Sequence, residues 1–352
     1  MDQLIKKIVI RLIFFGFILV SQSALSNALK AEILKTWTLP SDFKINNKKI
    51  GGLSGCTLFD DKVYFVTDDR GSNGGPRIIS FYFDKKDNEF NFNKSAVLKI
   101  NPDNQKKILD LEGIGMISTD LFLLSSEGDL NQKPRIMPEI FWSDHLGNKT
   151  AAIQFPKEFL PEKSGKQTMG IQTNLAFEGL VVDLELKKWA AILEAPLLQG
   201  PKELKLIESD INSKNFDQIY SYPVPEDLNP ENISGYFGAT DILFLDESRY
   251  LILERGVQAS FQGISFQTQL CTATKNNVKN NLKDQSKNEK NQLRRECFYS
   301  MNKDATLTSQ FPNGANFEGL CWVNKQKKLF LTVSDNNFSK NEKTVLILYQ
   351  LH

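Results

Sequence analysis

Short apolar runs recur in pairs along the chain, and a short polar turn separates the two runs of each pair. The clearest pair is Asn-Leu-Ala-Phe-Glu-Gly-Leu-Val-Val at 174–182 and Trp-Ala-Ala-Ile-Leu-Glu at 189–194. Two apolar runs of strand length with a turn between them predict a β-hairpin. Five such pairs can be recognised. If Ser54, Glu112, Glu178, Asp241 and Glu318 are taken as equivalent positions, the pairs are 58, 66, 63 and 77 residues apart. A period of this size predicts a repeat architecture.

Two more apolar runs follow the hairpin in each of the first four repeats. They lie at 78–83 and 96–100, 139–142 and 150–155, 204–208 and 218–222, and 264–270 and 296–301. The last repeat has three runs, whereas the run at 32–39 has no partner nearby. A strand at 32–39 would complete the last blade and remove two exposed sheet edges. We therefore predict an all-β propeller of five four-stranded antiparallel blades, with a sixth degenerate blade in the longest interval as the alternative.

Acidic residues occupy corresponding positions in these hairpins. The start of the first strand of an antiparallel pair lies beside the end of the second, so the acids of one hairpin should share one sheet edge. These acids are Asp68 and Asp69 in the first repeat, then Glu112 with Glu127, Glu178 with Glu194, Asp241 with Glu254, and Glu318 with Asp335. In a radial arrangement they converge at one mouth of the central channel. Converging carboxylates repel, so the ring needs protonation or a bound cation; the alternative is that each acid marks an ordinary turn at a solvated rim.

Composition and charge exclude some classes of partner. The chain has 43 basic and 42 acidic residues and is 41% hydrophobic, which is a normal globular composition. A net charge of +1 gives no electrostatic reason to expect nucleic acid or a membrane surface as the main partner. We expect a monomer with one large repeat domain at 29–352, interrupted by an Asn/Lys-rich insertion loop at 275–296.

The N-terminus has the pattern of a secretory signal. Lys6, Lys7 and Arg11 precede the apolar run at 12–20, and small residues at 26–28 suit a signal peptidase. This run is much shorter than the roughly 20 apolar residues that span a bilayer, which argues against the alternative of a membrane anchor. We therefore predict a signal peptide at 1–28, cleaved near Ala28, and a periplasmic or secreted mature chain.

Four cysteines fit an oxidising compartment. A disulfide between Cys271 and Cys297 would tether the insertion. Cys56 and Cys321 lie in the first and last repeats, which are neighbours in a closed ring, and they could pair or remain buried thiols because four cysteines allow three connectivities. A zinc site is not expected, since Cys-x-x-Cys is absent and the chain has two histidines.

The ordered motifs resemble those of a known family. They are Gly-Leu-Ser-Gly with Thr-Asp-Asp-Arg, Leu-Glu-Gly-Ile with Ser-Ser-Glu, Phe-Glu-Gly-Leu with Leu-Glu-Ala-Pro-Leu, Thr-Asp-Ile-Leu with Leu-Glu-Arg-Gly, and Asn-Phe-Glu-Gly-Leu with Ser-Asp-Asn-Asn-Phe. This set, from about Gly51 to Leu351, resembles the phytase-like family described as "esterase-like activity of phytase". The resemblance implies an exported β-propeller distantly related to calcium-dependent phytases, which hydrolyse phosphomonoesters. The Asn/Lys insertion departs from the family pattern.

A metal-assisted phosphoester hydrolase needs oxygen ligands for a cation and basic groups for the phosphate. The ten acids named above are the candidate ligands of Ca²⁺, and Glu178 and Glu318 are also candidate catalytic residues. Arg70 and Arg255 directly follow ring acids, so they are the candidate phosphate-binding groups, with salt bridges to those acids as the alternative. Lys133 and Arg135 are weaker candidates. The expected nucleophile is metal-bound water, acting on a small phosphorylated or ester substrate.

The same residues are compatible with two other functions and disfavour a third. A serine hydrolase is disfavoured, because Gly-x-Ser-x-Gly is absent and two histidines leave little choice of base. A propeller without catalysis could use the ring acids to hold a structural Ca²⁺ and bind a ligand or protein. A metal-dependent sugar-lactone hydrolase would also suit a channel lined with carboxylates. Turnover that depends on the ring acids in a folded protein would separate an enzyme from a scaffold.

Overall fold

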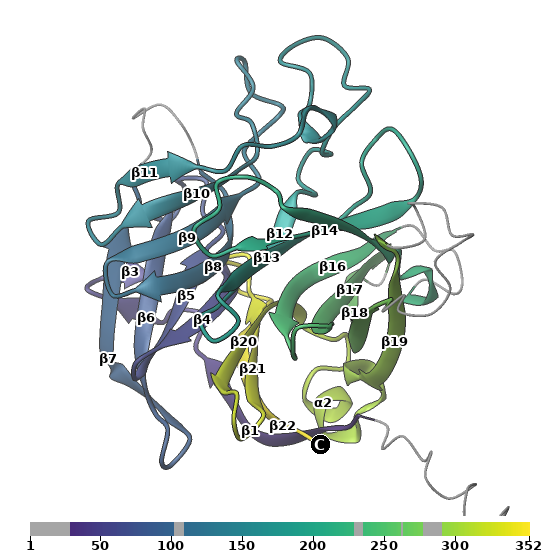
Figure 1. Cartoon of the computed structure of the whole chain (residues 1–352). Coiled ribbons are helices and arrows are strands. Elements are labelled where there is room, and N and C mark those ends of the chain that lie inside the picture. The colour runs from purple at the N-terminus through teal and green to yellow at the C-terminus, as the bar shows by residue number, and fades with distance from the viewer. Residues whose placement is uncertain (1–28, 102–108, 229–234, 262, 277–290) are drawn as a thin grey trace, which may run out of the picture.

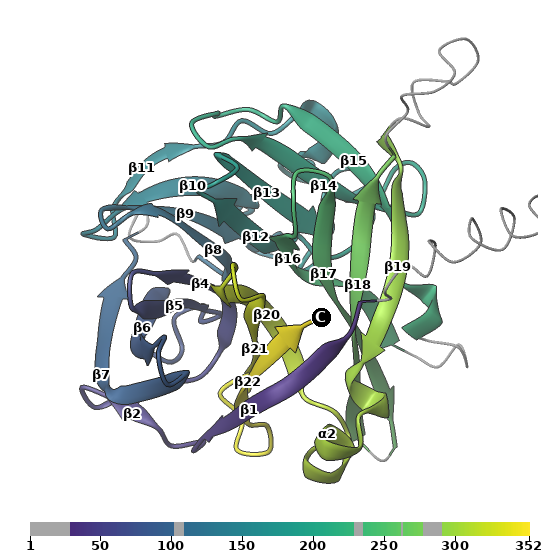
Figure 2. The same cartoon turned by 60° about the horizontal axis from the view of Figure 1, so that its bottom comes forward.

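Five four-stranded antiparallel sheets stand around a common axis, which is the arrangement of a β-propeller (Figures 1 and 2). The computed structural model describes residues 29–101, 109–228, 235–261, 263–276 and 291–352. The predicted signal peptide and most of the predicted insertion loop lie outside these residues. The predictions of an all-β fold and of five blades are confirmed.

Each blade runs outward from the strand nearest the axis. Blade 1 contains β4 (Leu53–Phe59), β5 (Lys62–Thr67), β6 (Arg77–Asp84) and β7 (Glu89–Lys99), and blade 2 contains β8 (Leu111–Ser118), β9 (Leu121–Ser126), β10 (Glu139–Asp144) and β11 (Lys149–Ala152). Blade 3 contains β12 (Phe177–Asp183), β13 (Lys188–Leu193), β14 (Glu203–Asp210) and β15 (Gln218–Pro223). Blade 4 contains β16 (Gly235–Phe244), β17 (Arg249–Ser260), β18 (Gly263–Lys275) and β19 (Leu293–Ser300). Blade 5 contains β20 (Asn316–Asn324), β21 (Leu329–Asp335), β22 (Thr344–Leu351) and β1 (Ala31–Leu39).

The N-terminal strand closes the ring, as the unpaired apolar run predicted. β1 pairs antiparallel with β22, with Ala31 opposite Leu351 and Leu39 opposite Thr344. The outer strand of blade 5 therefore comes from the N-terminal part of the chain, whereas its other three strands are C-terminal. This closure joins the first described strand to the last and covers the edge of β22 that would otherwise be unpaired.

The apolar core lies between neighbouring blades, so the strands are buried on both faces. Val63 and Phe65 of blade 1, for example, belong to one buried cluster with Leu331 and Leu346 of blade 5. The innermost strands contact one another in the order β4, β8, β12, β16 and β20, and β20 returns to β4. Contact between residues far apart in sequence thus holds the ring together.

Few helices and strands of the described chain lie outside the blades. A two-stranded hairpin, β2 (Lys44–Ile45) and β3 (Lys48–Lys49), precedes blade 1, and the six-residue helix α2 (Ala305–Gln310) lies between blades 4 and 5. The longest repeat interval is therefore taken up by long strands and α2, and a sixth blade is not formed. Within the described residues, no helix has the length and apolar character needed to cross a membrane.

All four cysteines form disulfides. Cys56–Cys321 joins β4 to β20 across the contact between the first and last blades, and Cys271–Cys297 joins β18 to β19 within blade 4. The pairing that the sequence left open for Cys56 and Cys321 is thereby decided. β19 begins at Leu293, a few residues inside the predicted insertion.

We expect the double variant Cys271→Ala/Cys297→Ala to lose about 3 kcal/mol of unfolding free energy. The disulfide closes a segment of 26 residues, and an open segment of this length has more conformational entropy in the unfolded chain. Urea unfolding of wild type and variant, both followed by far-ultraviolet circular dichroism, measures the difference. If the midpoint and slope of the urea transition are unchanged, the disulfide affects the free energy of neither the folded nor the unfolded chain.

Candidate functional site

Every blade has a β-bulge near the same end of its innermost strand. The pairing between the first and second strands shifts register there in all five sheets. The residues left without a partner include, in blade order, Ser54, Glu112, Glu178, Thr240 and Glu318. On each second strand, a charged residue directly follows the residue that pairs next to the bulge. These residues are Asp68, Glu127, Glu194, Arg255 and Asp335. Bulges redirect side chains, and here they bring two sets of polar residues to one mouth of the ring.

A glycine follows the unpaired acid where neighbouring innermost strands approach closely. A Cβ atom added to Gly113 would lie 2.4 Å from Cβ of Leu180, and one added to Gly319 would lie 2.4 Å from the carbonyl oxygen of Ser54. Neither distance can accommodate a side chain. The Glu-Gly motif is therefore explained by a redirected acid followed by a close contact between blades.

The register in blade 4 corrects the sequence alignment by one residue. Ala239 pairs with Glu254 and Asp241 pairs with Leu253, so Thr240, and not Asp241, corresponds to Glu178. By the same register Arg255, and not Glu254, corresponds to Glu194. A shift of one residue along a strand reverses the face to which a side chain points. Asp241 and Glu254 consequently do not line the cavity described below.

Asp241 instead links three innermost strands. Its carboxylate accepts hydrogen bonds from the backbone N–H groups of Leu180 on β12 (3.3 Å) and Leu320 on β20 (2.6 Å). The Ile242 N–H donates to it as well. Burial raises the pKa of Asp241 well above its usual value, while these backbone donors act in the opposite direction.

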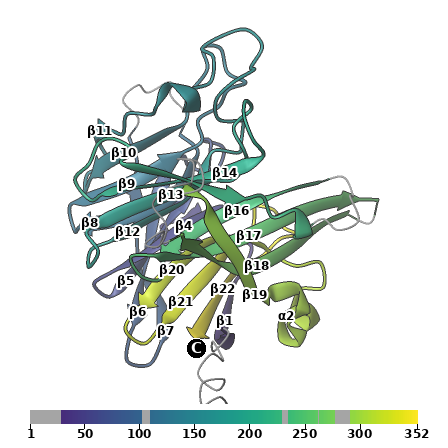
Figure 3. The ribbon, with the colours of Figure 1, turned by 45° about the vertical axis from the view of Figure 1, so that its right-hand side comes forward.

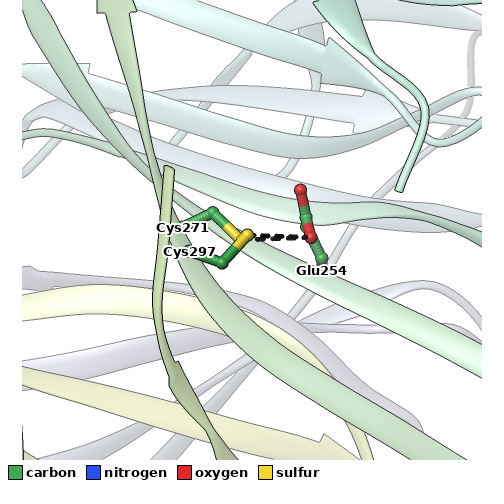
Figure 4. Close-up of side chains that lie close together, drawn as sticks. All are labelled: Glu254, Cys271 and Cys297. Carbon is green, nitrogen blue, oxygen red and sulfur yellow. Dashed lines mark hydrogen bonds between the residues drawn. A yellow bond between two sulfur atoms is a disulfide. The ribbon is translucent and has the colours of Figure 1, made fainter. Parts of the chain in front are cut away.

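Glu254 lies in blade 4 against the Cys271–Cys297 disulfide (Figure 4). Both carboxylate oxygens accept hydrogen bonds from Arg295, at 2.6 and 2.7 Å, and the Tyr222 hydroxyl donates to it at 2.6 Å. The carboxylate is fully buried and fully used by these partners. Its position supports packing between β15, β17 and β19.

Two further predicted ligands lie outside the cavity. Asp69 is buried, pairs with Arg77 at 2.6 Å, and accepts backbone hydrogen bonds from Gly71 and Gly75. These bonds fold the loop after β5. Asp335 is buried beside the cavity and lines a neighbouring groove.

The remaining six predicted ligands line one cavity of about 280 Å³. They are Asp68, Glu112, Glu127, Glu178, Glu194 and Glu318. The other polar lining residues are Arg70, Arg255, Asn174, Tyr236, Asn316, Asn337 and Glu342. Antiparallel pairing within the blades and their radial arrangement together bring acids from blades 1, 2, 3 and 5 to one place.

The carboxylates of blades 1 to 3 form two overlapping groups. Oxygen atoms of Asp68, Asp110 and Glu112 lie within 4.8 Å of one another, and so do those of Glu112, Glu127 and Glu178. Glu112 belongs to both groups, and we call the five residues the acidic cluster. The Oδ1 atom of Asp110 is buried and has no hydrogen-bond partner among the described residues.

Asp110 was missed by the sequence analysis. A signal was present, because Asp110 precedes Glu112 by two residues as the pocket-lining Asn316 precedes Glu318. The corresponding residue in blade 3 is Ala176, so the position does not stand out as polar in every repeat. Asn174, Tyr236 and Glu342 were also missed, because they lie on loops or at strand positions with no repeat pattern.

Burial and mutual repulsion favour the protonated forms within the acidic cluster. Burial, followed by the charges of neighbouring carboxylates, raises the pKa values of Glu112 and Glu178 well above the usual range. The pKa of Glu127 rises to about 8, mainly through burial and the charge of Glu194. The pKa of Asp110 rises to about 10 through burial and its proximity to Asp68. A cation among these groups would favour the ionised forms instead.

Arg255 neutralises the opposite side of the cavity. The buried guanidinium pairs with Glu194 at 2.7 Å and with Glu318, and it donates to Asn316 at 2.6 Å. The Tyr236 hydroxyl lies 3.3 Å from Nη2. Burial raises the pKa of Glu318 to about 7 against the opposing effect of Arg255. The structure therefore places Arg255 in the salt bridges that the sequence analysis gave as the alternative to substrate contact.

Arg70 is more accessible than Arg255. Its side chain is 40% exposed, and its guanidinium pairs with Asp110 and donates to Asn174. Glu127 lies 4.0 Å away. Arg135, a weaker candidate, donates to the carbonyl oxygens of Leu130, Glu162 and Gly165 in a loop. Of the predicted basic residues, Arg70 is the one available at the cavity surface.

The chain was compared with known families and structures. The model of the phytase-like family, described as "Esterase-like activity of phytase", matches residues 48–338. No curated protein matches the chain. Among solved structures, the catalytic domain of an α-L-arabinofuranosidase from Coprinopsis cinerea is 13% identical with a TM-score of 0.44, covering 89% of this chain and 98% of that one. An α-L-arabinofuranosidase from Lactobacillus brevis is 10% identical with a TM-score of 0.46, covering 85% and 91%.

Proposed function

Because the chain belongs to the phytase-like family described as "Esterase-like activity of phytase", we propose that it is a calcium-dependent phosphoester hydrolase. The single observation that supports this most is the acidic cluster, in which two groups of three carboxylates share Glu112 at the mouth of the ring. The cavity beside the cluster is open to a small substrate. The family model covers residues 48–338, which include all five members of the acidic cluster, so both observations support the same proposal.

The acidic cluster fits calcium by its chemistry. All five side chains offer carboxylate oxygen, which is the donor that Ca²⁺ prefers, and Asp110 has an unused buried oxygen. Among the described residues, Arg70 is the basic residue that forms ion pairs with members of the cluster, so five ionised carboxylates would have too little positive charge in direct contact. Calcium held there would polarise a phosphate oxygen and make a water molecule more acidic.

The chain's own groups provide positioning and proton transfer. Arg70 can donate to a phosphate oxygen through the guanidinium atoms that Asp110 and Asn174 do not use. Glu318, whose pKa is about 7, can accept a proton from the attacking water near neutral pH. Arg255 and Asn316 hold the Glu318 carboxylate in place. Arg255 is thus a positioning residue in this proposal.

The proposal includes export of the chain as a monomer. Two disulfides are typical of an oxidising compartment, and they support the signal peptide predicted at 1–28. Cleavage near Ala28 would leave β1 intact, because β1 begins at Ala31. Mass spectrometry of the exported chain and light scattering of the mature protein test these two points.

The direct test is hydrolysis of a panel of phosphomonoesters, including phytate, with Ca²⁺ and with a chelator. Turnover should require Ca²⁺, and Glu178→Gln should lower kcat/KM by at least about 100-fold, because it removes a direct ligand and changes beside ligands already cost roughly 10- to 100-fold. Asp183→Asn is a matched control, since Asp183 ends the same strand, β12, and pairs with Lys325 outside the cavity. It should keep wild-type turnover.

Other outcomes would redirect the proposal. Stabilisation by Ca²⁺ without turnover of any phosphomonoester would favour a binding propeller with a structural ion. Calcium-dependent opening of a sugar lactone without phosphate release would favour the lactone hydrolase. Turnover that survives both chelator and Glu178→Gln would remove the acidic cluster from the reaction.

A further inference from the structure

A second hollow of about 500 Å³ adjoins the cavity. Ile264, Phe266, Asn316 and Glu342 line both spaces, so the two share a wall. We call the second hollow the side groove. It lies between the β17–β18 hairpin, the segment joining α2 to β20, and the segment joining β21 to β22. A ligand bound in the cavity can therefore extend into the side groove.

The long hairpin of blade 4 builds one wall of this groove. β17 and β18 have 12 and 13 residues, whereas β5, β9 and β13 have six each (Figure 3). The ladder continues past Arg255, which pairs with Thr268, to Ser260 opposite Gly263. Within the described residues, the second strands of the other blades end at or before the position that matches Arg255, and blade 2 adds one isolated bridge, between Asp129 and Ile136. The extension of the ladder in blade 4 brings Ile264 and Phe266 to the edge of the cavity.

Apolar side chains form much of the groove surface. Ile264 and Phe266 lie on the hairpin, and Phe311 and Pro312 lie on the opposite side after α2. Ile264 is 55% exposed and lines the groove together with Phe266 and Phe311. Exposed apolar groups that line a hollow are typical of ligand contact.

Basic groups are few in the two spaces. Arg70 and Arg255 are paired with acids, and Lys343 is the one Lys or Arg among the lining residues of the side groove. Its ammonium lies 6.0 Å from the centre of the Phe311 ring. A substrate with many phosphates needs several uncommitted basic groups to compensate its charge. The lining suits one phosphate joined to an uncharged group.

We propose that the side groove binds the apolar alcohol or phenol part of a phosphomonoester while the phosphate occupies the acidic cavity. This inference rests on the proposed function and narrows its substrate class. The substrate is a monophosphate ester of an apolar or aromatic group, and a polyphosphorylated molecule fits less well. Ile264 and Phe266 are the specificity-determining residues.

The test compares phenyl phosphate with 2-naphthyl phosphate. Their leaving groups are similar phenols that differ by one fused ring, so a difference in KM reports on binding of that ring. We expect KM to be about tenfold lower for the naphthyl ester, since small apolar increments in a fitting pocket change specificity by roughly this factor or more. Ile264→Ser should reduce the ratio to about threefold or less. Leu184→Ser is the control, because Leu184 is also an exposed aliphatic residue but follows the far end of β12.

Binding of the two esters can be measured even if the protein does not hydrolyse them, so the groove assignment can be tested apart from the hydrolase proposal. If neither ester is turned over, calorimetry with each ester in Ca²⁺ replaces KM. Tighter naphthyl binding that Ile264→Ser removes would support the groove and contradict the hydrolase. Turnover with equal KM values, or faster hydrolysis of phytate than of either ester, would overturn the groove assignment and leave the hydrolase standing. A naphthyl preference unchanged by both Ile264→Ser and Phe266→Leu would also overturn it.

Discussion

Replacing Glu112 with glutamine is expected to lower calcium-dependent turnover by at least about 1,000-fold. Glu112 belongs to both groups of the acidic cluster, so the change would remove a proposed calcium ligand from each. Changes to residues that only support ligands already cost roughly 10- to 100-fold in metal affinity or activity. The loss should therefore exceed that of Glu178→Gln, because Glu178 belongs to one group.

The same variant should be at least as stable as wild type when calcium is chelated. The Glu112 carboxylate is buried among like charges that raise its pKa, so a neutral isostere removes repulsion. The Ser54 hydroxyl, which donates to Glu112 at 2.9 Å, can donate to the glutamine oxygen instead. Wild type should gain about 2.7 kcal/mol per site at a Ca²⁺ concentration of 100 times Kd, and the variant should gain much less.

Thermal melting with Ca²⁺ and with chelator measures both effects beside the kinetics. Asp120→Asn is a suitable control, because Asp120 lies at the far turn of the same β8–β9 hairpin with its side chain 74% exposed. It should melt and respond to Ca²⁺ like wild type. A Glu112→Gln protein that is destabilised in chelator, yet still stabilised by Ca²⁺, would contradict a cation site in the acidic cluster.

Arg255→Met is expected to cost about 3–5 kcal/mol of unfolding free energy at pH 8. The change leaves the buried carboxylates of Glu194 and Glu318 without their shared cation, and breaking a buried ion pair from one side typically costs this much. Asn316 and Tyr236 also lose the guanidinium as a hydrogen-bond donor. Methionine keeps the packing of the aliphatic part of arginine and removes its charge and its hydrogen-bond donors.

The cost should shrink as the pH falls. The folded pKa of Glu318 is about 7, above its usual value, so the stability that comes from protonation is present at low pH and is lost as the pH rises through about 7. Without Arg255 this pKa would be higher still, because the guanidinium opposes the increase. Below about pH 6 the Glu318 carboxyl is neutral in both proteins. The difference in unfolding free energy between wild type and variant therefore increases above pH 7.

Urea unfolding from pH 5 to pH 9 in chelator measures this dependence. Arg249→Met on the same strand provides the control, since Arg249 forms an exposed pair with Asp246 and should change stability by under about 0.5 kcal/mol. Arg255→Lys should recover part of the loss, because it restores the charge but not the forked geometry. A difference that is constant across this range would show that loss of packing, and not of charge, explains the effect.

The amino-acid sequence determined the architecture. The five hairpins, their period and the unpaired apolar run at 32–39 predicted five blades closed by the N-terminal strand, and the structure confirms this. These features are readable because alternating burial and strand length are local properties of the chain. The meeting of Glu112 and Glu127 followed from antiparallel pairing within blade 2, and that of Glu178 with them followed from the radial arrangement of the blades.

Tertiary contacts were needed to establish which residues enter the cavity. In blade 4 the acids Asp241 and Glu254 are offset by one residue from the positions that Glu178 and Glu194 occupy in blade 3, and Thr240 and Arg255 stand at those positions instead. An offset of one residue turns a side chain to the opposite face of the strand. Asp110 joins the cluster by lying close to Asp68 of blade 1, and the spacing that it shares with Asn316 does not by itself predict this contact. The side groove arises from a long hairpin meeting loops of another blade. The blades could be predicted because their strand patterns are local, whereas the site depends on how the blades pack against one another.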